Sequence, residues 1–292
     1  MTAVARPRRQ RPVSGVSRAG AIVRGIVLGL GALLFLFPFY YMVIGSLQTT
    51  VDPSIAGAFP NPGNLTLDNY VAINSRINLL TGLVNSGIFT GGVLLGTFVF
   101  GLLAGYSLAM LQWRGRSATF ALALLVQVVP FQLLMIPLYV LIARDFGLAD
   151  NYLGMILPFF INSTAVVIFR AYFLQLPKEL FEAARIDGAS ELRLLWSVAI
   201  PLVRPALVTV VLLTFIGPWN EFLWPFLVTK DAALQPLAVS LANYITTVSA
   251  SAANPFGAIL AGALVLAAPV VVLFIVFQRY FTSTDIGSGV KG

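Results

Sequence analysis

Six long apolar stretches limit what this chain can fold into more than any other feature. A helix that crosses the hydrocarbon core of a bilayer needs about 20 predominantly apolar residues. Six stretches qualify, at residues 25–46, 83–111, 118–143, 155–174, 205–228 and 256–281. Only 10% of the 292 residues are charged, whereas a soluble domain carries roughly a quarter. The sequence therefore predicts an all-α integral membrane protein with six transmembrane helices.

The basic residues predict the orientation of these helices. If the N-terminus is cytoplasmic, only Arg76, Arg144 and Lys230 of the 18 Lys and Arg residues fall outside. The positive-inside rule then places both termini in the cytoplasm. The chain divides into a cytoplasmic tail (1–23), a first helix with its outer loop (24–82), a core (83–281) and a second tail (282–292). The basic residues that orient the helices also account for the net charge of +7, so we expect no nucleic-acid partner.

The residue types that are missing exclude several kinds of chemistry. The sequence contains neither cysteine nor histidine, which rules out disulfides, thiolate or Ser-His nucleophiles and the usual zinc sites. It also lacks a G-x-x-x-x-G-K-[ST] phosphate-binding loop. We expect a non-catalytic membrane protein that binds no cofactor or metal of its own.

A charged segment at residues 176–204 interrupts the apolar sequence and contains the stretch "LFEAARIDGASEL" at residues 180–192. Pro177 suits the first position of a helix that runs to Asp187. Gly188 can end it in the left-handed region, and Ser190 can cap a second helix. That helix would have an apolar stripe at Leu192, Leu195, Trp196 and Ala199. The charges indicate either a solvated face or a surface that docks a partner.

The spacing in this segment resembles the EAA loop of ABC importer permeases, which reads E-A-A, three residues, G, nine residues, I-x-L-P. Here Glu182-Ala183-Ala184 precede Gly188 by three residues, and nine more lead to the stretch from Val198 to Pro201. Val198 and Ile200 replace the family's Ile and Leu. The resemblance implies that Glu182, Ala183, Ala184, Asp187 and Gly188 couple the chain to an ATPase.

Four further stretches resemble the carbohydrate, maltose-type branch of that family: "FPFYYMVIGSL", "LTLDNY", "PWNEFLWP" and "GVKG". In this branch two different permeases form one pathway, and an extracytoplasmic binding protein delivers sugar. Two ATPase subunits, which bind ATP and Mg, drive transport. The alternatives are an ABC permease for another solute, such as glycerol phosphate, a peptide or an anion, or a secondary transporter. A secondary transporter usually needs several buried ionisable groups.

Five residues within the predicted spans are candidates for lining the pathway: Glu221, Asn220, Trp219, Gln127 and Gln132. Glu221 is the only carboxylate inside a span, where it could contact the solute or support the end of the helix. Trp219 could instead anchor the helix at the membrane interface, and the glutamines could bond to neighbouring helices. Prolines 218 and 225 are expected to break the fifth span, and prolines 130 and 137 to kink the third.

Two further expectations concern packing and the outer loops. Six glycines (87, 91, 92, 96, 101 and 105) line the second span, and their small size favours close helix packing within the chain over a homodimer face. Residues 230–255 are polar enough to leave the bilayer and include a short predicted helix at 238–245.

Overall fold

The computed structural model describes residues 18–248 and 254–282, and almost all of this part is helical. Three helices are long and apolar enough to cross a membrane unbroken: α1 (Arg18–Ser46), α3 (Leu79–Met110) and α14 (Pro255–Thr282). Three bent pairs pass the same test, so the described residues contain up to six spans. The sequence prediction of six agrees with this upper number.

Two of the bent pairs contain a break within a predicted span. The helices α4 (Arg116–Val126) and α5 (Phe131–Tyr139), followed by the π-helix η3 (Val140–Asp145), meet at 94°. The helix α6 (Tyr152–Ile156), with the 3₁₀ turn η4 (Leu157–Phe159), meets α7 (Ser163–Phe173) at 48°. Pro130 precedes the first residue of α5, which fits the predicted kink there.

The third bent pair begins inside the charged segment. It joins α9 (Glu191–Leu194), the π-helix η5 (Leu195–Ala199) and α10 (Ile200–Leu202) to α11 (Arg204–Asn220) at 81°. The fifth predicted span, 205–228, is therefore not one helix, because α11 ends at Asn220 and α12 (Leu223–Val228) begins after a two-residue break. The predicted prolines flank this break.

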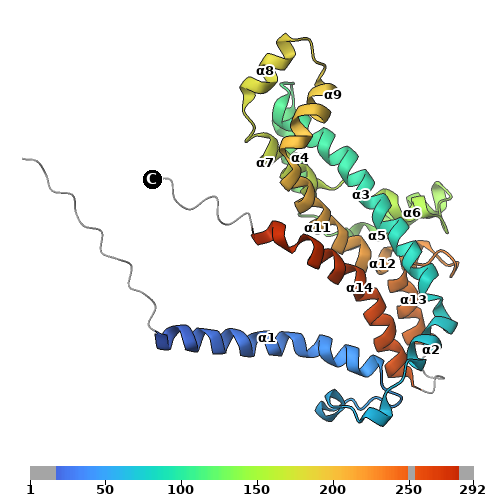
Figure 1. Ribbon diagram of the computed structural model, residues 1–292. Helices are drawn as coiled ribbons and strands as arrows, with labels where there is room; N and C mark the ends of the chain where they lie inside the picture. Colours follow the sequence, from blue (N-terminus) through green and yellow to red (C-terminus); the bar gives the residue numbers. More distant parts are fainter. Residues whose placement is uncertain (1–17, 249–253, 283–292) are drawn as a thin grey trace, which may run out of the picture.

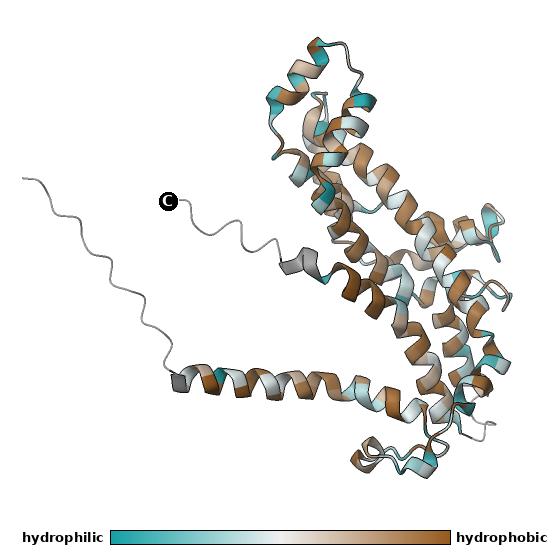
Figure 2. Ribbon diagram, in the orientation of Figure 1, coloured by the Kyte–Doolittle hydropathy of each residue, from teal (hydrophilic) through white to brown (hydrophobic). Residues whose placement is uncertain are grey.

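The connections predicted to lie on the outer side contain shorter helices. The 3₁₀ turns η1 (Ile55–Ala58) and η2 (Pro62–Asn64) precede α2 (Asp68–Ile77), and α3 begins at Leu79, four residues earlier than predicted. The helix α13 (Leu237–Asn243) and the π-helix η6 (Tyr244–Val248) occupy the place of the predicted 238–245 helix. Figure 2 shows hydrophilic residues concentrated in these connections and in α8 (Lys178–Ile186) and α9.

The helix α1 extends away from the other helices (Figure 1). Its last turn is the part that packs, since Gly45 lies directly against Leu260 of α14. Along the rest of the helix the large apolar side chains are exposed, and Phe35 reaches 78%. The chain alone therefore leaves most of this helix uncovered.

The glycines of α3 let it pack closely on α6 and α7. A side chain at Gly92, Gly96 or Gly105 would collide with Ile156, Phe160 or Phe169, respectively. At Gly87 and Gly91, by contrast, an added Cβ would meet open space. The prediction of close packing within the chain is confirmed for the first three positions.

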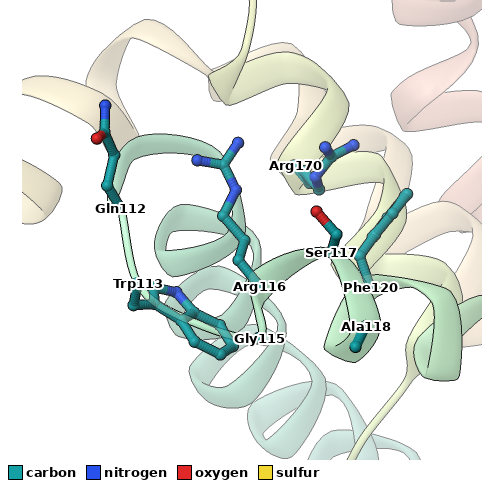
Figure 3. Close-up of a pocket in the computed structure, with 8 residues that line it drawn as sticks. All are labelled: Gln112, Trp113, Gly115, Arg116, Ser117, Ala118, Phe120 and Arg170. Atoms are coloured by element: carbon teal, nitrogen blue, oxygen red, sulfur yellow. The ribbon is translucent and has the colours of Figure 1, made fainter.

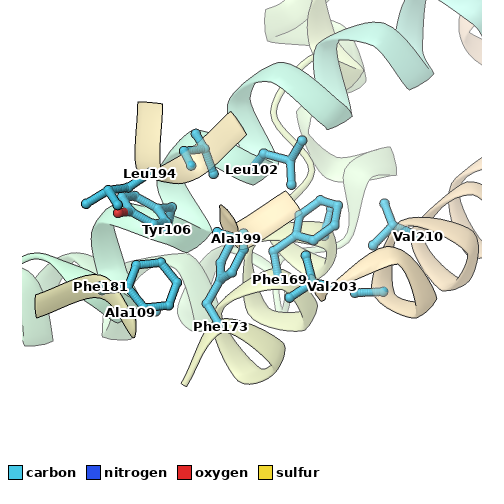
Figure 4. Packing of buried hydrophobic residues seen from close by; sticks show 13 residues of the cluster. Leu102, Tyr106, Ala109, Phe169, Phe173, Phe181, Leu194, Ala199, Val203 and Val210 are labelled. Carbon is cyan, nitrogen blue, oxygen red and sulfur yellow. The ribbon is translucent and has the colours of Figure 1, made fainter. Parts of the chain in front are cut away.

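A buried apolar cluster joins α3 and α7 to the charged segment and α11 (Figure 4). Tyr106 of α3, Phe173 of α7 and Phe181 of α8 pack ring against ring, with centroids of Tyr106 5.6 Å and 6.4 Å from the other two. Leu195 and Ala199 are also buried there. The charged segment is thus anchored on the transmembrane helices by an apolar core.

The predicted apolar stripe of the second short helix is half wrong. Leu195 and Ala199 are buried, but Leu192 and Trp196 are 61% and 62% exposed. The π-helix η5 explains the difference, because its wider turn changes which residues share a face. Leu194 is buried in their place.

Candidate functional site

The helices α8 and α9, with the turn at residues 187–190, form a helix–turn–helix that we call the bracket. Pro177 is the residue before the first turn rather than its first helical position, and Asp187 ends α8. Gly188 has φ +81°, in the left-handed region. Its N–H donates to the Arg185 carbonyl, and the N–H of Ala189 donates to that of Ala184, both at 3.0 Å. These two bonds define a Schellman motif, so the predicted glycine stop is confirmed.

Ser190 begins the second arm of the bracket. Its side chain accepts a hydrogen bond from the N–H of Arg193 at 3.4 Å, as a helix cap does. The bracket angle is therefore set by two local devices, a left-handed glycine and a serine cap. Both were predictable because they depend on neighbouring residues alone.

The outer face of the bracket carries charge and apolar surface together. Glu182, Ala183 and Asp187 are exposed, whereas Ala184 is half-buried against the core cluster. Ile186 is 87% exposed, an unusual degree for a large apolar side chain. The exposed face of α8 therefore presents two carboxylates and one large apolar side chain.

A polar network ties the bracket to α3. The Tyr106 hydroxyl donates to Glu191 at 2.7 Å, and Arg185 donates to the same carboxylate through Nε at 2.6 Å and Nη2 at 3.2 Å. The hydrogen bond from the guanidinium to this carboxylate raises the pKa of Arg185 above its ordinary value. Arg185–Glu191 is the single ion pair in the described part of the chain. The network was not predicted, since its three members come from three different helices.

A second feature is a cavity of about 320 Å³ bounded by α4, η4, α7 and α11. Gln127 and Glu221, two of the candidate pathway residues, both line it. Asn162, Thr164 and Thr214 add an amide and two hydroxyl groups to the lining of the cavity. These three residues were not among the candidates predicted from the sequence. Among the residues that the structure describes, none that lines this cavity is basic. Hydroxyl, amide and carboxylate groups on an otherwise apolar wall can bind a polyhydroxylated solute.

Glu221 has a structural role as well as a position in this cavity. Its Oε1 accepts hydrogen bonds from the N–H groups of Leu223 at 3.0 Å and Trp224 at 3.2 Å, which caps α12. Gln127 accepts a bond from the Thr164 hydroxyl at 3.2 Å, linking α4 to α7 as predicted for a glutamine in an apolar helix. Each residue thus has the structural role that the sequence allowed and also lines the cavity, while a contact with the solute stays a prediction.

The remaining three candidates do not line this cavity. Trp219 is 5% exposed, stacks on Phe215 with centroids 5.2 Å apart and donates its indole N–H to the Leu266 carbonyl at 2.9 Å. Trp219 therefore has a packing role in this structure, and its part in lining a pathway stays a prediction. Asn220 and Gln132 are exposed, and the Asn220 side chain donates to the Ile216 carbonyl at 2.9 Å.

The chain is similar to known transport proteins over most of its length. Residues 97–283 match the family described as "Binding-protein-dependent transport system inner membrane component". An arabinooligosaccharides transport system permease protein, AraQ, from Halalkalibacterium halodurans is 34% identical over 89% of this chain and 93% of its own. The sn-glycerol-3-phosphate transport system permease protein UgpE from Brucella abortus is 28% identical over 93% and 96%.

A solved structure has the same fold. It is that of a bacterial ABC transporter involved in the import of the acidic polysaccharide alginate. One of its chains superposes with a TM-score of 0.78 and 26% identity, covering 93% of this chain and all of that one.

Proposed function

Since this chain belongs to the family of binding-protein-dependent transport system inner membrane components, we propose that it is a permease subunit of an ATP-driven sugar importer. Together with a second, different permease it forms the translocation pathway. An extracytoplasmic sugar-binding protein delivers the solute, and two ATPase subunits hold and hydrolyse ATP with Mg. The chain itself is not an enzyme and binds no cofactor.

The topology that we propose follows the basic residues. The bracket faces the cytoplasm, because Arg116, Arg170, Lys178 and Arg185 all lie on or beside it. The membrane is the bacterial cytoplasmic membrane, which the chain crosses six times. Of the two tails proposed as cytoplasmic, residues 1–17 and 283–292 lie outside the described residues.

The bracket is the proposed contact with an ATPase subunit. The exposed positions 182, 183, 186 and 187 supply both charge and apolar surface, and the Schellman turn fixes the angle between its arms. A force on the bracket is passed to α3 through the network of Tyr106, Glu191 and Arg185. A pump that lacks its own phosphate loop needs this kind of contact to use ATP.

The second permease would cover surfaces that this chain leaves open. The apolar faces of α1 are exposed along most of the helix, and the 320 Å³ cavity opens to the surface of the isolated chain. A partner of the same fold could cover the helix and close the pathway over the cavity. Lipid would cover the apolar surface that remains.

A sugar is the proposed cargo, and the cavity is the observation that carries this proposal. Its polar groups are neutral amides and hydroxyls with one carboxylate, Glu221, which favour a neutral polyol over an anion. The relatives leave a specific second candidate, since UgpE proteins are named for sn-glycerol-3-phosphate. The carboxylate of Glu221 would repel a phosphate ester, so the cavity favours a sugar over sn-glycerol 3-phosphate.

Uptake in a strain that lacks only this chain tests the proposal. Complementation should restore uptake of labelled arabino-oligosaccharides, and a Glu221→Gln variant should reduce it. Depletion of ATP should abolish uptake, whereas an uncoupler that spares ATP should not. Recovery of glycerol 3-phosphate uptake alone would favour the second candidate, and uptake driven by an ion gradient without ATP would reject the importer.

A further inference from the structure

A second cavity, of about 600 Å³, lies beside the bracket and plays no part in the function proposed above. Residues of the segment 112–120 and Arg170 of α7 line it (Figure 3). Arg116 comes from the start of α4, and its guanidinium and that of Arg170 lie on the same side of the loop as the Ser117 hydroxyl. Two cations and a hydroxyl thus face one space.

Neither guanidinium is neutralised by a carboxylate within the part of the chain that the structure describes. Arg116 donates one bond to the Leu111 carbonyl at 3.0 Å. Arg170 donates from Nε to the Leu108 carbonyl at 3.3 Å and lies 3.9 Å from the centroid of the Phe120 ring. These contacts hold each arginine in place and leave other N–H groups available for an anion.

The chemistry of the lining selects an anion with several oxygens. Arginine binds phosphate through paired N–H donors, and the Ser117 hydroxyl can donate a further bond. Trp113, which is 41% exposed, borders the same cavity. Tryptophan is enriched at the level of lipid headgroups, where its ring meets apolar chains and its N–H meets water.

We propose that this cavity binds the phosphate of an anionic phospholipid in the cytoplasmic leaflet. The inference rests on the proposed topology, which places this end of α3 and α7 at the cytoplasmic surface. Basic pockets between transmembrane helices on that side hold anionic headgroups by the same electrostatic attraction. A smaller hollow that shares Gln112 and Arg116 contains Glu182 and reaches the bracket, so a bound lipid would lie against the coupling surface.

Native mass spectrometry of the purified full chain tests this proposal. Phosphatidylglycerol or phosphatidylcholine is added in detergent, and the lipid that stays bound is counted. We expect phosphatidylglycerol to be retained in preference. Arg116→Gln and Arg170→Gln should each weaken retention about fivefold. Arg170→Lys, which keeps the charge but not the paired N–H donors, should weaken retention less than Arg170→Gln does.

Arg114→Gln is the matched control, since Arg114 lies in the same loop but does not line the cavity. Its retention should equal that of the wild type. Equal loss in the Arg114 and Arg116 variants would mean diffuse attraction and overturn the proposal, as would equal retention of the two lipids. Binding of inorganic phosphate without phosphatidylglycerol would assign the cavity to a soluble anion instead.

The outcome is separable from that of the uptake experiment. Lipid retention needs neither partner subunits nor solute, so a permease that imports sugar but retains no lipid refutes only this inference. A chain that retains lipid but imports no sugar refutes only the proposed function. Repeating the measurement on the complex with its ATPases should give the same preference, and its disappearance would mean that a protein covers the cavity.

Discussion

Replacement of Gly188 by valine should uncouple the permease while leaving its membrane fold intact. Gly188 has φ +81°, and an added Cβ would meet no atom within 4 Å. The penalty therefore comes from the backbone alone, about 1–2 kcal/mol for a side chain in the left-handed region. A β-branched residue lies at the upper end of that range or above it.

Alternatively, the backbone at position 188 leaves the left-handed conformation, which breaks the Schellman motif. The bonds from Gly188 to Arg185 and from Ala189 to Ala184 would be lost, each contributing about 0.5–1.5 kcal/mol. Strain costs about 1–2 kcal/mol and the loss of both bonds about 1–3 kcal/mol, so the native bracket becomes less populated by a factor of roughly 5 to 30 along the less costly route. The bracket would lose its angle, whereas α3 and α7 would still pack through their buried cluster.

Sugar uptake and co-purification of the ATPase should be measured together at matched membrane expression. Asparagine enters the left-handed region more readily than other non-glycine residues, so Gly188→Asn is the matched control. We expect coupling to fall in the order Gly, Asn, Ala, Val. Glu182→Lys should act in the same direction more weakly, because it reverses one exposed charge without moving the backbone. Full uptake by Gly188→Val, or an equal defect in Gly188→Asn, would refute the conformational argument.

Three further predictions test other parts of the structure. Tyr106→Phe removes the hydrogen bond from the Tyr106 hydroxyl to Glu191. Because the Glu191 side chain is 40% exposed, water can hydrate its carboxylate, and the loss of folding stability should be only about 1 kcal/mol. We also expect weaker coupling of ATP hydrolysis to uptake. Gly96→Leu should prevent folding, since its side chain would collide with Phe160, whereas Gly91→Leu should be tolerated; expression and thermal unfolding in detergent decide this. Asn61→Cys should react with an impermeant maleimide on intact cells if the 47–82 connection is extracytoplasmic, and protection of this cysteine would reverse the topology.

The bracket could be read from the sequence because its geometry depends on near neighbours. The left-handed glycine, the serine cap and the end of α8 all follow from residues within a few positions of one another. The burial of Trp219 could not be predicted in this way. It depends on the carbonyl of Leu266 in α14, 47 residues later, and a single sequence does not reveal that pairing.

The 320 Å³ cavity also could not be predicted from the sequence alone. Periodicity located Gln127 and Glu221 on separate spans, but only the breaks after Val126 and Asn220 bring them to one space. Asn162, Thr164 and Thr214 were not predicted, because a single polar residue in an apolar stretch has no spacing that indicates a site. A polar residue next to a predicted helix break is the signal that could have identified Asn162, since it caps α7 at a bent pair.

The unbroken helix α3 suggests how the two ends of the permease communicate. Of the candidate spans in the described residues, α1 and α14 contain prolines and three are bent pairs, whereas α3 has neither feature. Its 32 residues extend about 48 Å. At one end Tyr106 bonds to the bracket, and at the other Asn85 donates to the carbonyls of Ala233 and Gln235 before α13. Because a continuous helix resists bending, we expect a displacement of the bracket to reach the α13 end as a shift of all of α3.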